Sequence, residues 1–290
     1  MRQAVESALA QRGASKEVIV VDDGSTDGSR GLLRQYAGRI ELIELEENCG
    51  AIAARNAGVA RCCGKYIAFL DGDDVLMPWA LDVYNRLIIE RNPKIILGSS
   101  TWFTTPEPPA MDGHEPQKIE FVSYKYFMAK DRPCGLSASL LVVERKAFCQ
   151  AGAWTPGIFH LDLVDLAAKL GYCGTTVQVS QPPTAFYRFH AGNSIQQVPP
   201  FVNMAHRLLE KERAGAYPGG PERRLERYAW FGGMVVFWIK RAMRSGLYAG
   251  AAGLIADGWP MVLAAVKQRT IAWLLGRAPM ENVALKRIQS

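Results

Sequence analysis

Two apolar runs of this chain end abruptly in clusters of acidic residues, and this pattern limits the folds that the chain can adopt. The runs are EVIVVDDGSTDGS (17–29) and YIAFLDGDDVLMP (66–78), and a helical pattern follows each of them. Strand-like and helical segments continue to alternate up to KIILGSSTWF (94–103). Such alternation predicts an α/β fold with a mostly parallel sheet that is flanked by helices.

Both acidic turns fall at the carboxyl ends of predicted strands, where open α/β sheets bind their ligands. The turn at residues 71–74 holds three carboxylates, which repel one another when they lack a partner. A D-x-D pair in this position suits a divalent cation that shares a diphosphate. A simple acidic turn is an alternative. A calcium loop would need further ligands that are absent, and a phosphatase motif would lie near the first strand of its fold.

The turn VDDGSTD (21–27) allows two interpretations. Ser25, Thr26 or Asp27 could cap the helix that follows, which would be a purely structural role. Alternatively, a carboxylate at the end of the strand would accept hydrogen bonds from a nucleobase or a ribose. The turn alone does not decide between them.

The last third of the chain differs from the rest in its predicted secondary structure and in its net charge. Residues 201–290 hold 14 Lys/Arg against 6 Asp/Glu, whereas residues 1–200 hold 20 against 22. Their helical pattern, with helices expected at 201–214, 222–244, 246–256 and 260–275, predicts a basic helical region after an α/β domain that ends near residue 200. Aromatic residues across 227–277 indicate a helical core or interface, or else peripheral contact with an anionic membrane.

Other features bear on location and partners. No uninterrupted apolar window of about 18 residues is present, so a spanning helix is not expected. The six cysteines form no CxxC pair, which predicts free, mostly buried thiols in a reducing cytoplasm. We therefore expect a cytoplasmic protein, or one at the inner face of the plasma membrane, without a nucleic-acid partner.

Three segments, taken together, resemble family 2 glycosyltransferases. They are EVIVVDDGSTDGS, ENCGAIAARNAGVARCCGKYIAFLDGDDVLMP (47–78) and AFYRFHAGNSI (185–195), and they occur in the family's order. The resemblance covers roughly residues 1–195. It implies a GT-A fold, which is Rossmann-like, and an inverting enzyme that transfers a sugar from a nucleotide-diphosphate donor. In this family the donor is usually UDP-linked, and the cofactor is Mn²⁺ or Mg²⁺.

The resemblance also implies roles for the acidic residues. Asp23 is similar to the carboxylate that reads the nucleobase, with Asp22 as its neighbour at the strand end. Asp71 and Asp73 are similar to the D-x-D pair, in which Asp73 would bind the metal and Asp71 would lie nearer the ribose. Asp74 is similar to a supporting residue beside the pair.

Three basic or imidazole side chains are assigned in the same way. Arg55, which precedes Asn56 in the family's ARN helix, would face the phosphates or hold its helix by a salt bridge. His190 matches a position near the metal and the diphosphate, although a structural role is an equal alternative. Arg188 is similarly placed.

The chain departs from the family pattern at its beginning. Family members begin with a strand that reads like VSVIIPTYN, whereas this chain begins at the helix that follows it. The first strand is therefore expected to be missing, either because the start is assigned too late or because the chain is truncated. Loss of that central strand would expose a sheet edge.

A second departure concerns the catalytic base. When Asp165 and Lys169 are aligned with the family's helix, Asp162 and Leu163 fall on its Glu–Asp pair. The residue expected to deprotonate the acceptor is then apolar. Asp162 is the candidate base, with Asp165 as a weaker alternative.

The resulting hypothesis is an inverting, hexosyltransferase-type enzyme of bacterial cell-envelope polysaccharide or glycolipid synthesis. Its acceptor would be a saccharide or a lipid-linked molecule. The alternative is a degenerate, non-catalytic relative that binds a nucleotide or a partner. Nucleotidyl transfer would need a basic, Gly-rich phosphate loop near the N-terminus, and the sequence contains none.

Overall fold

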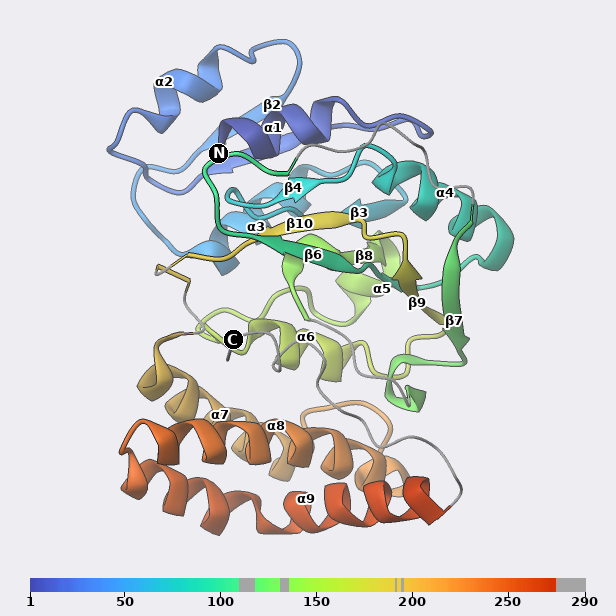
Figure 1. Ribbon diagram of the computed structural model, residues 1–290, viewed down its shortest axis with the longest axis vertical. Helices are drawn as coiled ribbons and strands as arrows, with labels where there is room; N and C mark the ends of the chain where they lie inside the picture. The colour runs from blue at the N-terminus through green and yellow to red at the C-terminus, as the bar shows by residue number, and fades with distance from the viewer. Residues whose placement is uncertain (110–117, 131–135, 191, 194–195, 275–290) are drawn as a thin grey trace. The chain divides into compact units, whose positions relative to one another are not determined.

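The computed structural model describes residues 1–109, 118–130, 136–190, 192–193 and 196–274, with side chains up to residue 268. The chain forms two compact units, an α/β unit and a helical unit (Figure 1). The first unit contains residues 1–127, 134–157 and 173–190, and the second contains residues 128–133, 158–172 and 191–290. The helical unit thus takes in segments that lie before the division expected at residue 200.

A parallel pair of strands forms the N-terminal part of the first unit. The elements here are α1 (Arg2–Leu9), β1 (Ile19–Asp22), α2 (Ser29–Arg34), β2 (Glu41–Glu44) and α3 (Ala51–Arg61). Helix α2 connects the two strands, as parallel pairing requires. Val5, Leu33 and Tyr36 form a buried cluster that fixes α1 and α2. Among the described strands, β1 pairs with β2 alone.

The largest sheet of the first unit has the strand order β3-β8-β5-β9-β7. Its strands are β3 (Tyr66–Ala68), β5 (Ile95–Leu97), β7 (Glu120–Tyr124), β8 (Leu141–Glu144) and β9 (Thr176–Gln181). Only β5 and β9 run parallel, and the other neighbouring pairs are antiparallel. The α/β class is as expected, but the sheet is mixed because β8 inserts antiparallel between β3 and β5.

A three-stranded sheet lies beside the acidic turn. Its order is β4-β10-β6, with β4 (Val75–Leu76), β10 (Ala185–Arg188) and β6 (Ser100–Phe103). Strand β10 pairs antiparallel with β4 and parallel with β6. Because β4 directly follows residues 71–74, this pairing brings the segment AFYRFH to the acidic turn.

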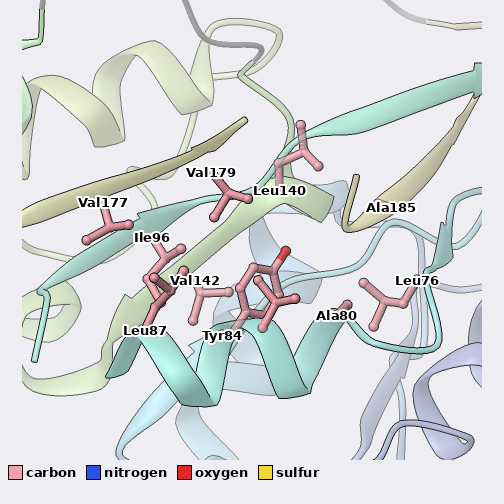
Figure 2. Packing of buried hydrophobic residues seen from close by; sticks show 11 residues of the cluster. Leu76, Ala80, Tyr84, Leu87, Ile96, Leu140, Val142, Val177, Val179 and Ala185 are labelled. Carbon is pink, nitrogen blue, oxygen red and sulfur yellow. The ribbon is translucent and has the colours of Figure 1, made fainter. Parts of the chain in front are cut away.

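Helix α4 (Ala80–Arg91) covers the sheets and forms the main core of the first unit (Figure 2). Its positions Ala80, Tyr84 and Leu87 follow a helical spacing and face the sheet. On the sheet side, the cluster is completed by Leu76, Ile96, Leu140, Val142, Val177, Val179 and Ala185. Short elements accompany this core: η1 (Phe127–Ala129), η2 (Ala138–Leu140) and α5 (Arg145–Gln150).

The second unit consists of helices. They are α6 (Asp162–Lys169), α7 (Val198–Arg213), η4 (Pro221–Arg223), α8 (Arg224–Arg244) and α9 (Tyr248–Leu274). Phe201 of α7 stacks on Trp238 of α8, with ring centroids 4.3 Å apart. Helices α8 and α9 lie side by side (Figure 1), and a Cβ at Gly232 would lie 2.0 Å from the backbone oxygen of Met261. A glycine is therefore required where the two helices meet.

Helix α9 is continuous, so the prediction of two helices at 246–256 and 260–275 is wrong between residues 248 and 274. Pro260 lies inside the helix, where proline lacks an N–H and normally breaks the hydrogen-bond ladder. Leu254 and Met261, on either side of it, are 0% and 1% exposed. Tertiary packing therefore outweighs the local cost of the proline.

Two further expectations concern membrane-spanning helices and the cysteines. The segment Tyr248–Gln268 of α9 is long and apolar enough to cross a membrane by length and composition alone. A search for uninterrupted apolar runs misses it because Asp257 lies inside it. Among the described cysteines, which are all free, Cys49, Cys63 and Cys149 are exposed rather than buried.

Candidate functional site

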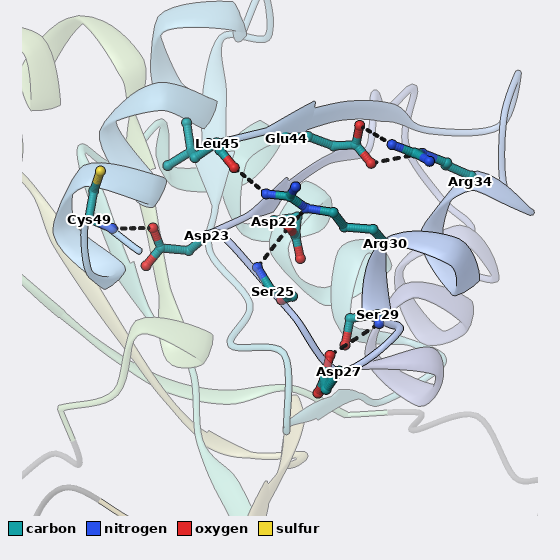
Figure 3. Close-up of polar contacts among 10 residues, drawn as sticks. All are labelled: Asp22, Asp23, Ser25, Asp27, Ser29, Arg30, Arg34, Glu44, Leu45 and Cys49. Carbon is teal, nitrogen blue, oxygen red and sulfur yellow. Dashed lines mark hydrogen bonds and ion pairs between the residues drawn. The ribbon is translucent and has the colours of Figure 1, made fainter. Parts of the chain in front are cut away.

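Asp22 ends β1 and points into the protein (Figure 3). Its Oδ2 accepts hydrogen bonds from the Ser25 N–H at 3.1 Å and from Arg30 Nε at 2.8 Å. Burial acts to raise the pKa of Asp22, but the bonds from Arg30 and Ser25 hold this pKa below its ordinary value. Its Oδ1 is buried without a hydrogen-bond partner in the described part of the chain. These contacts hold the turn, and the expected role in donor binding stays a prediction.

Asp23 ties the end of β1 to the start of α3 (Figure 3). Its two carboxylate oxygens accept the backbone N–H groups of Cys49 and Gly50, each at 2.8 Å. These N–H groups precede the helix and have no acceptor within it, so an anion here is favourable. Each carboxylate oxygen has a second lone pair, which remains suitable for a nucleobase N–H.

Gly24 makes this turn possible. Its φ is +70°, and a Cβ would lie 2.4 Å from Asn48 N and from the carbonyl carbon of Glu47. A backbone approach this close excludes any side chain. The glycine of the DDG sequence therefore sets the position of Asp23 beside α3.

Replacing Gly24 by alanine is expected to lower the free energy of unfolding by more than about 1 kcal/mol. The new methyl group would push the turn away from Glu47 and Asn48. Gly28→Ala is the matched control, because Gly28 has a φ of +85° but nothing within 4 Å of its Cβ position. Urea unfolding of both variants separates backbone strain from the clash, and equal losses would contradict the proposed clash.

The acidic turn is held by Ser139, which comes from the distant η2 segment. The Asp71 N–H donates to Ser139 Oγ at 3.0 Å, and Ser139 Oγ donates to Asp74 Oδ2 at 2.6 Å. The Arg188 N–H of β10 donates to Asp74 Oδ1 at 2.9 Å. Asp74 is only 1% exposed. It is therefore the internal support of the turn, as the resemblance implies.

Burial raises the pKa of Asp74 to about 6, and the nearby charges of Asp73 and Asp71 act in the same direction. A carboxyl whose pKa is higher in the folded state than its ordinary 3.8 binds its proton more tightly when folded. The stabilisation that the protonated Asp74 gives the folded state is therefore fully present at a pH below 3.8, and it is lost as the pH rises through about 6.

In metal-free buffer, Asp74→Asn is expected to flatten the pH dependence of the unfolding free energy between these two pKa values. The full effect of such a shift is about 3 kcal/mol. Urea unfolding at a series of pH values measures it. Asp82→Asn, which removes a carboxylate at the protein surface, should leave the wild-type pH dependence intact. An unchanged slope in Asp74→Asn would contradict the assignment.

Arg55 connects α3 to the acidic turn. Its Nη2 lies 2.7 Å from Asp71 Oδ1, and its guanidinium lies over the Trp154 ring at 5.0 Å from the centroid. Asn56 holds Trp154 in place through its Nδ2, which donates to the Trp154 oxygen at 2.9 Å. Of the two roles expected for Arg55, the salt bridge is present, and a contact with phosphates stays a prediction.

Asp73 is the accessible carboxylate of the turn. Its side chain is 44% exposed, and its Oδ2 lies 3.1 Å from His190 Nε2. The loop to His190 is held by Arg188, whose Nε donates to the Asp73 backbone oxygen at 3.0 Å and whose guanidinium lies over Phe103. Arg188 thus positions the pair through the backbone.

No cluster of three or more His, Cys, Asp or Glu side chains that could hold a metal is present among the described residues. Such a cluster is not needed for Mg²⁺ that binds together with a nucleotide. One or two carboxylates then hold the ion, and phosphate oxygens and water fill the other coordination positions. The exposed Asp73 fits this type of site, and Mn²⁺ accepts the same carboxylate oxygens.

An aromatic group lies on one face of the β6–β10 pair. Trp102 stacks on Phe189 at 5.9 Å, and it also contacts the Tyr187 ring at 5.6 Å. The Trp102 side chain is 40% exposed. Burial raises the pKa of Tyr187 to about 12, and the charges of the acidic turn add to this effect. The group therefore lies within electrostatic reach of the turn.

The candidate base belongs to the second unit. Asp162 is the first residue of α6, and Leu163 follows it. Asp165, the weaker alternative, is 1% exposed and accepts a hydrogen bond from Tyr217 at 2.8 Å. It also pairs with Lys211 of α7. The carboxylate of Asp165 is therefore used in contacts within the helical core. The role of Asp162 as the base stays a prediction.

Known proteins share this fold or match the N-terminal part of the chain. Residues 1–139 match the family described as glycosyl transferase family 2. This part of the chain belongs to that family. S. aureus TarS 1-349 has the same fold, with a TM-score of 0.55 at 14% identity over 92% of this chain and 87% of TarS. Its complex with UDP-GlcNAc gives a TM-score of 0.54 at 13% identity, covering 92% and 88%.

Curated relatives match the family 2 domain over shorter segments. TuaG of Bacillus subtilis (strain 168), named for teichuronic acid biosynthesis, is 44% identical over 91 residues. The succinoglycan biosynthesis protein ExoO of Rhizobium meliloti (strain 1021) is 46% identical over 90 residues. These matches cover 30% and 31% of this chain, and 36% and 25% of the relatives. The chain therefore matches about a third or less of either relative.

Two residues of the candidate site escape sequence reasoning. Ser139 and Trp154 lie far along the chain from the acidic turn, in segments without a recognisable motif. A serine just before a buried strand and a lone tryptophan have the pattern of ordinary core residues. Only the fold places them against Asp71 and Arg55.

Proposed function

We propose that this chain transfers a sugar, with inversion, from a UDP-linked or similar nucleotide-diphosphate donor to a hydroxyl acceptor. The acceptor would be a saccharide or a lipid-linked molecule of cell-envelope polysaccharide synthesis. The observation that carries the proposal is that the three carboxylates of the acidic turn differ in burial and in contacts. Asp74 is buried and Asp71 is bound to Arg55, while Asp73 stays accessible beside His190.

Similar proteins support the donor class and the biological setting. The solved structure of TarS 1-349 that resembles this chain contains UDP-GlcNAc. TuaG and ExoO are named for teichuronic acid and succinoglycan biosynthesis. We accordingly place the activity in the cytoplasm, at the inner face of the plasma membrane.

In the proposed mechanism, Asp23 accepts a hydrogen bond from the nucleobase with the lone pairs that α3 leaves free. Asp73 would hold Mn²⁺ or Mg²⁺ together with the donor diphosphate. When bound, the cation would neutralise the charge that develops on the departing nucleotide. The imidazole of His190, which lies beside Asp73, would donate to a phosphate oxygen, and Arg55 keeps Asp71 in place. These residues act by positioning and by charge stabilisation.

The acceptor hydroxyl needs a base, and we assign this role to Asp162. The assignment rests on its position at the start of α6 and on the commitment of Asp165 to Tyr217 and Lys211. Asp162→Asn should then abolish transfer while leaving donor binding unchanged. Donor binding without transfer in the wild-type chain would instead support the degenerate, non-catalytic alternative, which Leu163 favours.

The aromatic group formed by Trp102, Tyr187 and Phe189 suits an acceptor sugar, because exposed rings bind the apolar faces of saccharides. Trp102→Ala is expected to raise the KM for the acceptor about tenfold, with the KM for the donor unchanged. Initial rates at varied acceptor concentration measure this effect. Phe159→Ala, which removes another exposed ring, is the control. An equal rise in the donor KM would contradict the assignment.

A panel of nucleotide sugars, tested with Mn²⁺ and a saccharide acceptor mixture, tests the proposed activity directly. Release of the nucleoside diphosphate that depends on both the metal and the acceptor is the expected result. If no nucleotide sugar is consumed and UDP does not bind, the proposal is wrong.

A further inference from the structure

Helix α9 carries a stripe of large apolar side chains that face solvent. The stripe consists of Tyr248, Ile255, Trp259, Leu263 and Val266, which are 69%, 51%, 58%, 58% and 53% exposed. Their spacing of seven, four, four and three residues places them on one face of the helix. Apolar residues scattered singly over a surface are ordinary, but a continuous stripe of this length indicates a partner.

An adjoining face of α9 is also apolar and is already packed against the rest of the helical unit. Ala251, Leu254, Met261 and Ala265 are between 0% and 5% exposed. The close approach at Gly232 shows that this face packs tightly on α8. A helix that is apolar all round is normally covered on all sides. In α9, the stripe remains exposed although the other apolar face is packed.

The same packing argues against a membrane-spanning helix. Only one side of the segment Tyr248–Gln268 is exposed to solvent, and the other side packs in the helical core. Asp257, in the middle of this segment, pairs with His206 at 2.5 Å and with Arg213 at 3.3 Å. Crossing a bilayer would break these contacts, so α9 is suited to lie on a surface rather than to cross it.

Most charges near the stripe are positive, and Asp257, the acidic residue of the segment 227–268, is paired with His206 and Arg213. Residues 227–256 contain no Asp or Glu. Lys240 and Arg244 are exposed near the turn into α9, and Lys267 is exposed directly after the last stripe residue. The stripe is therefore flanked by cations at both ends. Its two aromatic residues, Tyr248 and Trp259, are of the type that gathers at membrane–water interfaces.

We propose that the α9 stripe docks on an anionic lipid bilayer, with the apolar side chains in the interface and the flanking cations against the headgroups. This orientation would hold the protein at the surface where a lipid-linked molecule is found. The proposal concerns the helical unit only, and it does not depend on the proposed sugar transfer.

A second copy of the chain is a poorer occupant of the stripe. In a two-fold dimer the same patch meets itself, so Lys240, Arg244 and Lys267 would face cations of the partner copy. Like charges across an interface oppose association, whereas an anionic bilayer offers the opposite charge.

Sedimentation of the full chain with lipid vesicles tests the proposal. One set of vesicles contains phosphatidylcholine alone, and the other also contains phosphatidylglycerol. The wild-type chain should bind the anionic vesicles, bind the neutral ones weakly, and lose affinity as salt is added. The double variant Trp259→Glu/Leu263→Glu should lose at least about tenfold in affinity. Ile89→Glu, which alters an apolar residue of α4 that is 76% exposed, should bind like the wild type.

Two results would overturn the proposal. Equal binding of the double variant and the wild type would show that the stripe does not contact lipid. Sedimentation velocity is the second readout. If the wild-type chain is a dimer and the double variant a monomer, a second copy covers the stripe instead. Circular dichroism confirms that the variants keep their helices.

Discussion

Asp73→Asn is expected to lower kcat/KM for sugar transfer by about 10²–10³-fold, which is the usual effect of removing a group that stabilises developing charge. Asparagine preserves the size of the side chain but removes the negative charge that would hold the cation. Asp73 is 44% exposed, and its carboxylate has no part in the hydrogen bonds through Ser139 that hold the turn. The variant should therefore fold normally, and the loss should appear in turnover rather than in stability.

Two comparisons make this result specific. His190→Ala removes the neighbour of Asp73 and should have a smaller effect, about tenfold, because a cation could still bind the carboxylate. Asp82→Asn, at the protein surface on α4, should leave turnover unchanged. Rates are measured from release of the nucleoside diphosphate at varied Mn²⁺. If Asp73→Asn turns over at the wild-type rate, the acidic turn has no part in the proposed mechanism.

Glu212→Gln is expected to destabilise the helical unit by about 3–5 kcal/mol, because it leaves a buried guanidinium without its counter-charge. Arg227 Nε donates to both carboxylate oxygens of Glu212, at 2.9 and 2.8 Å, and the two side chains are 3% and 0% exposed. Arg227 Nη1 donates to the backbone oxygens of Pro218 and Gly220. The pair thus joins α7, α8 and the loop between them.

Urea unfolding followed by circular dichroism measures this loss. The double variant Glu212→Leu/Arg227→Met should be more stable than Glu212→Gln, because it removes both charges instead of stranding one. Glu44→Gln breaks the exposed pair between Arg34 and Glu44 and should cost less than about 1 kcal/mol. A similar small loss in Glu212→Gln would mean that the buried pair does not hold the unit together.

The order of the motifs along the chain was enough to predict much of the candidate site. Apolar runs that end in acids predict Asp23 and Asp73 at strand ends. In the structure Asp23 directly follows β1, whereas Asp73 lies in the turn between Ala68, the end of β3, and Val75, the start of β4. The segment containing His190 lies more than a hundred residues further on, but β10 pairs with β4 beside the acidic turn. Local patterns can locate such residues, because a residue next to a strand is positioned by the pairing of that strand.

Strand direction and helix continuity could not be predicted in the same way. The apolar pattern of β8 is identical whether it runs parallel or antiparallel to β5, because a buried strand has the same composition in both cases. Pro260 normally ends a helix, and only the packing of Leu254 and Met261 explains why α9 continues through it. Ser139 acts through a contact with Asp74 that no local pattern contains.

The most direct test of the central claim is the binding of UDP to the full chain with and without Mn²⁺, measured by isothermal titration calorimetry. The account predicts that UDP binds much more tightly with Mn²⁺, and that Asp73→Asn abolishes this gain while Asp82→Asn retains it. Binding that is equally tight without the metal, or a gain that survives in Asp73→Asn, would contradict the assignment of Asp73 as the metal ligand of a nucleotide-sugar site.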